Sequence, residues 1–225
     1  MPRRLPPGFY RRPTLKVAED LIGRVLVHTT REGTTVGRIV EVEAYIGETD
    51  PACHAAPGWT PRNAPLYGAP GRAYVYLNYG IHQLVNVVTE PEGVPAAILL
   101  RAAEPLEGLD LMRRRRDRRG SGRALERMEL CRGPGNLTKA MGITLAQNRS
   151  ALDESDFYLG DSPATRGKDP GTCDPTLAVV GWSPRIGIRV ATGRRWRCAL
   201  AGSPYVSGLR ATPAPQIHHS SVAGN

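Results

Sequence analysis

The stretch that decides the fold is Arg38–Ile46, which reads RIVEVEAYI. Its side chains alternate between two faces of an extended chain, with Val40, Val42 and Ala44 on one and Ile39, Glu41, Glu43 and Tyr45 on the other. Such alternation predicts a β-strand. The unusual feature is a pair of carboxylates inside an apolar run. Two interpretations stand: a solvated strand face, which is the more common case, or half-buried glutamates, one of them tuned toward a general base.

The segments around this strand predict a mixed α+β chain. Helices are expected over Leu15–Ile22 (with Thr14 as its N-cap), Leu106–Arg116 and Leu130–Gly142. Further strands are expected over Arg24–Thr30, Ala73–Tyr79, Leu84–Thr89, Ala96–Ala103, Thr176–Val180, Arg185–Ala191 and Arg197–Ala201. Residues 47–71, rich in Gly, Pro, Asn and Thr, predict a long loop of the kind that often carries function.

No internal repeat or linker divides the chain, so we expect a single α+β domain over residues 14–210. Residues 1–13 hold four Pro and four Arg and predict a flexible basic arm. Residues 211–225 are polar and predict a disordered tail.

The charge balance favours a polyanionic partner. The chain has 225 residues, with 30 Lys and Arg against 21 Asp and Glu, a formal net charge of +9. Only Lys16, Lys139 and Lys168 are lysines, and arginine suits phosphate groups. This points to nucleic acid before membrane. A GC-rich genome would produce the same arginine excess without any such function, so composition leaves both explanations open.

Several classes of protein are excluded by the composition. No stretch reaches the roughly 18 apolar residues of a membrane span, and the first residues lack the apolar core of a secretory signal. The four cysteines form no CxxC pair and the five histidines are scattered, so we expect reduced thiols and no metal site. A cytoplasmic, nucleoid-associated protein is therefore predicted.

Half of the eight tyrosines, namely Tyr67, Tyr74, Tyr76 and Tyr79, lie within thirteen residues. Tyr74 and Tyr76 would share one strand face, and Gly80 predicts a tight turn after Tyr79. Aromatic rings near arginines suit the stacking of nucleic-acid bases. A tyrosine-rich strand that packs a core explains the cluster equally well.

Two more features have a bland and a functional interpretation. His54, in the long loop, is either solvent-exposed or part of a pocket with the tyrosines. The run Arg113–Arg119 is either a solvated loop, the commoner case, or a source of nonspecific attraction to phosphates.

Six motifs follow one another between about Leu15 and Ser207: Gly37–Tyr45 (GRIVEVEAY), Thr60–Asn63 (TPRN), Pro70–Gly71 with Tyr74–Tyr76 (YVY) and Tyr79–Gly80, Leu99–Gly108 (LLRAAEPLEG), Leu130–Pro134 (LCRGP) and Gly202–Pro204 (GSP). Each motif is weak alone, but their order and spacing are specific. On these motifs the chain resembles the alkyladenine (3-methyladenine) DNA glycosylase family. The resemblance implies a single α+β domain around a curved antiparallel sheet with flanking helices, without a metal or cofactor.

The resemblance also implies the catalytic residues. Glu43 would be the general base that activates water, held with the help of Arg101 and the backbone carbonyl of Ile186. No lysine lies near these residues, so we expect no Schiff-base lyase step.

The remaining candidate residues, again by resemblance, would bind DNA. Tyr45 would stack on one face of a flipped base, and His54 and Tyr76 on the other. Asn86 would disfavour guanine by crowding its exocyclic amino group. Tyr79 would enter the duplex as a wedge, with Leu66 as a second apolar residue near it. His82 departs from members that carry an aromatic ring there.

The function implied is a monofunctional glycosylase of base-excision repair. It would act as a monomer on double-stranded DNA that contains damaged purines, with 3-methyladenine, 7-methylguanine, hypoxanthine and ethenoadenine as candidates. Two rival functions stay open. A noncatalytic damaged-DNA-binding module would need the basic, aromatic surface but not Glu43. A hydrolase of free nucleosides would need Glu43 but neither Tyr79 nor the positive charge, and its turnover would barely depend on salt.

Overall fold

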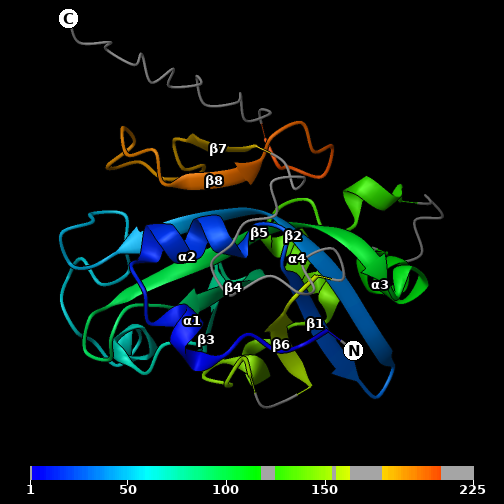
Figure 1. Ribbon diagram of the computed structural model, residues 1–225, viewed down its shortest axis with the longest axis horizontal. Helices are drawn as coiled ribbons and strands as arrows, with labels where there is room; N and C mark the ends of the chain where they lie inside the picture. Colours follow the sequence, from blue (N-terminus) through cyan, green and yellow to red (C-terminus); the bar gives the residue numbers. More distant parts are fainter. Residues whose placement is uncertain (1, 118–124, 154–155, 163–178, 209–225) are drawn as a thin grey trace, which may run out of the picture.

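The computed structural model describes residues 2–117, 125–153, 156–162 and 179–208 (Figure 1). In these ranges one antiparallel sheet contains eight strands. They are β1 Val25–Thr30, β2 Gly33–Ile46, β3 Ala73–Asn78, β4 His82–Val88, β5 Ala96–Glu107, β6 Phe157–Gly160, β7 Val180–Ser183 and β8 Arg197–Leu200. The predicted α+β class and curved antiparallel sheet are confirmed.

The long strand β2 organises the sheet. The main path runs β3-β4-β5-β2-β1-β6, so β5 pairs along one edge of β2. The other edge is shared: its first half pairs with β1, and Glu41–Glu43 pair with β8, which carries β7. Figure 1 shows β2 and β5 as long, bent ribbons with β7 and β8 above them. The stretch Arg38–Ile46 is thus at the centre of the fold.

Four α-helices and three short 3-10 helices complete the described part. They are α1 Pro7–Tyr10, α2 Thr14–Leu21, α3 Leu109–Arg116, α4 Pro134–Met141, η1 Ala64–Tyr67, η2 Arg127–Glu129 and η3 Leu145–Gln147. Helix α2 packs on β2 and β5, and α4 packs on β4 and β5. Helix α4 ends at Gly142, whose φ of +69° is the left-handed geometry that favours glycine.

The alternation along β2 is interrupted where Glu41 lies. The register passes from Ile39 opposite Ala103 to Glu41 opposite Ala102, so one extra residue, Val40, is accommodated. As a result Ile39 and Val42 both pack in the main core, whereas Val40 packs in a separate small cluster. The simple two-face assignment of these residues was therefore wrong.

The basic segment at residues 1–13 is not a free arm in the structure. Phe9 and Tyr10 of α1 are 2% and 0% exposed and belong to the main core, and Leu5 is buried with them. Arg12 forms an ion pair with Asp20 of α2. The prolines and arginines led to the prediction of a flexible arm, but Phe9 and Tyr10 attach this segment to the core. The predicted tail, 211–225, lies outside the described residues.

Some predicted elements differ in detail. Thr14 begins α2 but does not cap it; its hydroxyl donates to Glu90 instead. Strand β5 continues to Glu107, so the next helix starts later than predicted. The segment 185–191 is not a strand, and β6 was missed. Of the run Arg113–Arg119, the first four residues end helix α3, and 118–124 are not described.

Candidate active site

A cavity of about 390 Å³ opens between β3, β4, β5 and the segment 186–188. Its walls contain every predicted site residue except Glu43: Tyr45, His54, Leu66, Tyr76, Tyr79, Asn86, Arg101 and Ile186. Glu43 is 0% exposed and lies directly behind this wall, because three of the lining residues contact its carboxylate. Residues from β2, β3, β4, β5 and two loops thus converge at one place.

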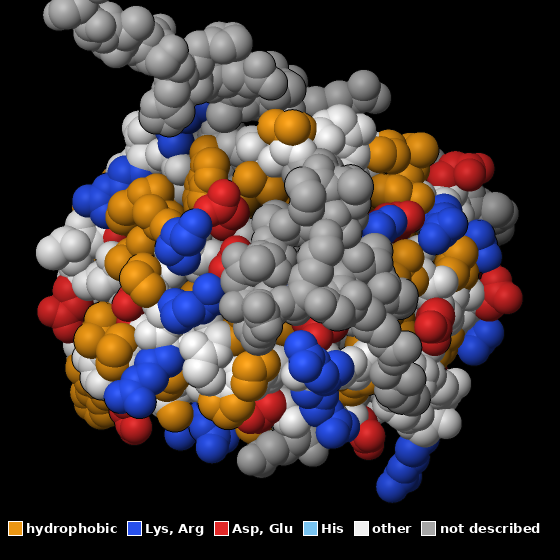
Figure 2. Space-filling model, in the orientation of Figure 1, with side chains coloured by type: hydrophobic (Ala, Val, Ile, Leu, Met, Phe, Trp, Pro, Cys, Tyr) orange, Lys and Arg blue, Asp and Glu red, His pale blue; other side chains and the backbone are white. Residues whose placement is uncertain are grey.

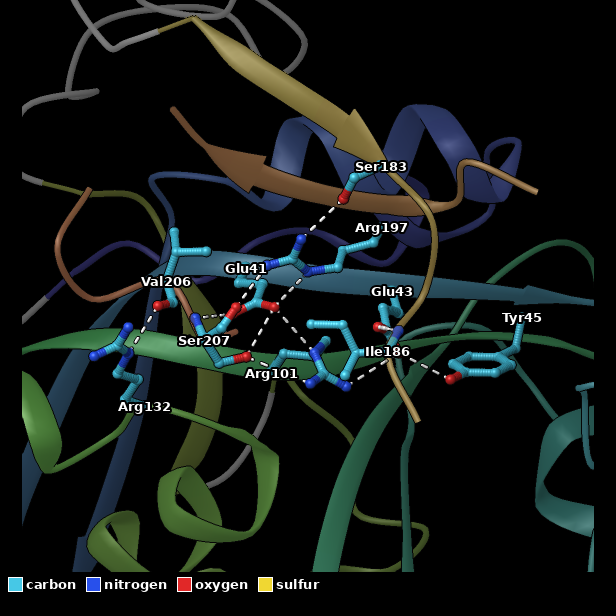
Figure 3. A network of polar contacts seen from close by, with 10 residues as sticks. All are labelled: Glu41, Glu43, Tyr45, Arg101, Arg132, Ser183, Ile186, Arg197, Val206 and Ser207. Carbon is cyan, nitrogen blue, oxygen red and sulfur yellow. Dashed lines mark hydrogen bonds and ion pairs between the residues drawn. The ribbon is translucent and has the colours of Figure 1, made fainter. Parts of the chain in front are cut away.

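The carboxylate of Glu43 is held from three sides (Figure 3). The backbone N–H of Ile186 donates to Oε1 at 2.7 Å, and the Tyr45 hydroxyl donates to Oε2 at 2.9 Å. Arg101 Nη1 lies 3.2 Å from the same Oε2. Ile186 therefore contacts Glu43 through its N–H, whereas the role implied by the family resemblance belongs to its carbonyl. Of the two interpretations of the glutamate pair, the solvated strand face is wrong.

Three aromatic rings form one wall of the cavity. Tyr74 and Tyr76 share a face of β3, as predicted, with ring centroids 5.3 Å apart. The His54 ring lies edge-on to Tyr76 at 4.5 Å, and its Nδ1 is hydrogen-bonded to the Tyr74 hydroxyl at 2.9 Å. Burial, aided by the nearby positive charge of Arg62, lowers the pKa of His54. Burial raises the pKa of Tyr74 to about 12. The wall is therefore uncharged at neutral pH.

The ring of Tyr45 forms the second aromatic wall and is supported by Arg185 and Asp50, which the sequence analysis did not single out. The Arg185 guanidinium lies 4.6 Å from the ring centroid and forms a two-pronged ion pair with Asp50, at 2.6 and 2.8 Å. Both charged side chains are 0% exposed. Burial disfavours the charge of Asp50, but the Arg185 fork outweighs it and holds the pKa of Asp50 below its usual value. This pair fixes the segment that presents Ile186 to Glu43.

The other candidate residues differ strongly in exposure. Tyr79 is 83% exposed at the tip of the β3–β4 hairpin, with a φ of +49°. Leu66, on η1, is 2% exposed and supports the cavity from inside. The amide nitrogen of Asn86 donates to the Tyr74 carbonyl at 3.1 Å, which fixes the orientation of that side chain in the wall. The aromatic tip thus stands free while the pocket residues are held.

On one face of the molecule the described positive side chains are spread rather than gathered in a single patch (Figure 2). On the face in Figure 2, described Lys and Arg side chains lie at several separate places between hydrophobic ones. Across the described ranges, no group of three His, Cys, Asp or Glu is arranged to hold a metal ion. Cys53 and Cys131 are buried thiols, and Cys198 is also buried. No helix in the described part is both long and apolar enough to cross a membrane.

Comparisons with known proteins agree with this geometry. The family model described as methylpurine-DNA glycosylase matches residues 8–204. A protein of Prosthecochloris aestuarii is 44% identical over 208 residues, 92% of this chain and 91% of its own. Relatives from Chlorobium phaeobacteroides and Methanocella arvoryzae are each 45% identical, over 92% and 90% of this chain and 96% and 95% of their own. The names of all three propose a 3-methyladenine DNA glycosylase activity.

The family match covers both glutamates, the aromatic wall and the segment around Ile186. The chain belongs to the methylpurine-DNA glycosylase family, and it is a hydrolase of N-glycosyl bonds that acts on DNA in the repair of alkylation damage.

Proposed function

We propose that this glycosylase extrudes a damaged purine from duplex DNA and hydrolyses its N-glycosidic bond with water activated by Glu43. The observation that carries this proposal is the burial of the Glu43 carboxylate directly behind a cavity walled by aromatic rings. A base inside a duplex is out of reach of such a carboxylate, so the nucleotide has to leave the stack.

The cavity suits a flat, electron-poor ligand. Tyr45 lies on one wall, and His54, Tyr74 and Tyr76 form another, so a purine that enters can contact aromatic rings on its faces. An alkylated purine is cationic, and its attraction to such rings contributes about 0.5–2 kcal/mol. The same charge makes the base a good leaving group. We therefore propose 3-methyladenine and 7-methylguanine as substrates, with the neutral lesions hypoxanthine and ethenoadenine as further candidates.

The proposed chemical step is a hydrolysis at C1′. Glu43 takes a proton from water, the water oxygen bonds to C1′, and the C1′–N bond breaks with its electron pair passing to the purine. Arg101 and the backbone at Ile186 flank the Glu43 carboxylate and would orient the water. The negative charge of Glu43 also stabilises the developing positive charge on the sugar.

Tyr79 is the proposed wedge. Its ring is 83% exposed and also lines the cavity mouth, so it can fill the gap that an extruded nucleotide leaves in the stack. Asn86, held by the Tyr74 carbonyl, is the proposed barrier to guanine. We propose that the protein acts as a monomer, because one chain supplies the wedge, the cavity and the carboxylate.

The test is single-turnover excision from a duplex with one hypoxanthine or one 7-methylguanine, with abasic sites revealed by alkali. Wild type should excise, and Glu43→Gln should lose about 10²–10⁴-fold in rate while binding the duplex normally. Glu19→Gln, at a partly exposed glutamate on α2, is the matched control and should keep the wild-type rate. Excision by Glu43→Gln at the wild-type rate would overturn the mechanism.

A salt series separates the rival functions. Binding to DNA should weaken steeply as salt rises, whereas turnover of a free nucleoside should hardly change. Salt-sensitive binding with no excision of any lesion would favour the noncatalytic DNA-binding module. Salt-insensitive turnover of free nucleosides would favour the small-molecule hydrolase.

A further inference from the structure

Glu41, two residues before Glu43, is the centre of a buried polar network (Figure 3). It is 0% exposed and does not line the cavity. Four donors reach its carboxylate: Arg197 Nε at 2.7 Å, Arg101 Nε at 3.0 Å, the Ser207 backbone N–H at 2.6 Å and the Ser207 hydroxyl at 2.9 Å. The carboxylate is therefore fully hydrogen-bonded despite its burial.

Arg101 connects the two glutamates. Its Nε donates to Glu41, and its Nη1 lies 3.2 Å from Glu43 Oε2. On the other side, Arg197 of β8 is paired in register with Glu43 but directs its Nε to Glu41. The two buried carboxylates therefore share the Arg101 guanidinium, and Arg197 forms a second ion pair with Glu41.

We infer that Glu41 is a positioning residue: it shares the Arg101 guanidinium with Glu43 and binds Arg197, and its negative charge so keeps Glu43 basic enough to activate water. This inference rests on the proposed role of Glu43. Without the negative charge of Glu41, Arg101 would keep its ion pair with Glu43 but lose the one with Glu41. A fully paired Glu43 would be a weaker base, and the surplus positive charge would oppose the cationic sugar.

The groups that face Glu43 support a direct electrostatic effect. They are Tyr45 on β2, Arg101 on β5, Tyr76 on β3, Arg197 on β8, and Arg185 with the Ile186 N–H on the segment after β7. Glu41 lies 3.0 Å from Arg101 Nε and 2.7 Å from Arg197 Nε, so its negative charge acts directly on both guanidinium groups. Charges act strongly on one another here because these side chains are almost fully buried.

Ser207 makes the arrangement rigid. Besides its two hydrogen bonds to Glu41, its carbonyl accepts from Arg197 Nη2 at 2.7 Å. The next residue, Gly208, lies so close to Ile186 that a Cβ there would meet Cδ1 at 2.8 Å. The segment that holds Glu41 therefore also packs against the residue whose N–H holds Glu43.

The test compares pH–rate profiles of single-turnover excision of 7-methylguanine, whose leaving group is already cationic in acid, so that the acidic limb reports the enzyme's base. Glu41→Gln should lower the plateau on the order of tenfold or more and move the acidic limb to lower pH by on the order of one unit. Arg197→Gln should move the limb to higher pH. In the double variant the two charge changes cancel, so the acidic limb should return toward its wild-type position.

Each single variant by itself tests the direction in which the acidic limb moves. If one variant does not fold, the other still serves as the test. Circular dichroism and binding to a duplex with an abasic-site analogue check folding. Glu41→Asp keeps the charge and should keep the limb near its wild-type position even if the rate falls. A lower rate with an unmoved limb in both folded single variants would overturn the inference and leave Glu41 a purely structural group.

The proposed function fails separately. If wild type does not excise, or if Glu43→Gln excises normally, the role of Glu43 is wrong and the inference falls with it. If Glu43 is essential and both single variants keep the wild-type profile, only the inference is wrong.

Discussion

Two cavities flank the hairpin of β3 and β4, and they differ in chemistry more than in size. The smaller, of about 390 Å³, has aromatic walls and a buried carboxylate behind them. The larger, of about 660 Å³, has polar and basic walls that include Arg115, Arg116 and Lys139. Tyr79 belongs to the first and Ile81 to the second, so the hairpin tip divides them.

Cavity volume therefore does not identify the candidate active site. The larger cavity is lined by the acidic residue Glu32, whose side chain is 63% exposed and forms an ion pair with Arg115. Behind the walls of the smaller one, the side chains of Glu43, Asp50 and Arg185 are fully buried. Asp50 and Arg185 are paired with each other, and Glu43 accepts from the Ile186 N–H. Buried charge is costly unless it is paired, so its concentration at one cavity marks the place where function is built.

The largest effect should come from the buried pair of the smaller cavity. Asp50→Asn leaves the Arg185 guanidinium buried without its counter-charge, and we expect a loss of about 3–5 kcal/mol in the free energy of unfolding. Glu32→Gln, the matched change at the larger cavity, removes an exposed partner and should cost at most about 1 kcal/mol. Urea unfolding at neutral pH measures both. Equal losses of unfolding free energy in the two variants would show that the buried pair contributes no more to stability than the exposed one.

A smaller effect should follow from the hairpin tip. Tyr79→Ser should weaken binding to a lesion duplex by about 5- to 150-fold, the range for loss of one aromatic stacking contact. It should affect the rate of the bound complex less. Ile81→Ser, at a 73% exposed residue of the larger cavity, is the control and should change binding little. Fluorescence anisotropy measures both, and a larger loss for Ile81→Ser would place the wedge on the wrong side of the hairpin.

The smallest effect should be a change in how stability depends on pH. His28 lies behind the larger cavity, where its Nδ1–H donates to the Met141 carbonyl, and burial lowers its pKa below 6.5. The unfolded chain therefore binds the proton more readily, so His28 stabilises the fold above pH 6.5 and this contribution is lost as the pH falls. His28→Gln should show a shallower loss of unfolding free energy between about pH 7.5 and about pH 5.

His82→Gln, on the lining of the same cavity, is the control for that measurement and should follow the wild-type curve. If all three proteins lose stability in parallel, His28 does not carry the dependence, and other groups titrate in its place.

The elements with strong periodicity were predictable from the sequence, and the irregular ones were not. The strand through Glu43, the aromatic strand β3 and the helix that ends at Gly142 are all found, because side-chain spacing and a glycine stop are local signals. The extra residue Val40 is not a local signal, since it depends on how β2 meets β5. The segment 185–191 alternates in sequence but is not a strand, and its start is held by the ion pair of Arg185 with Asp50 and by the hydrogen bond from Ile186 N–H to Glu43.

The same division holds for the site. Glu43, Tyr45 and Tyr76 stand out as residue types in an unusual place, and the family resemblance adds the others. Asp50 and Arg185 are 135 residues apart, and nothing in either local sequence announces the partner. The same is true of Glu41 and Ser207. Supporting pairs of this kind depend on the closed fold, and only the structure reveals them.

The hydrogen bonds from Ser207 to Glu41 have a consequence for the order in which the protein matures. These residues are 166 positions apart, and a polypeptide is synthesised from its N-terminus. Strand β2 can therefore leave the ribosome and pair with β5 while Glu41 still lacks three of its four donors, the one from Arg197 and the two from Ser207. The network that surrounds the reactive carboxylate closes only at the end of translation, so a chain arrested before Ser207 would carry the complete cavity around an unfinished base.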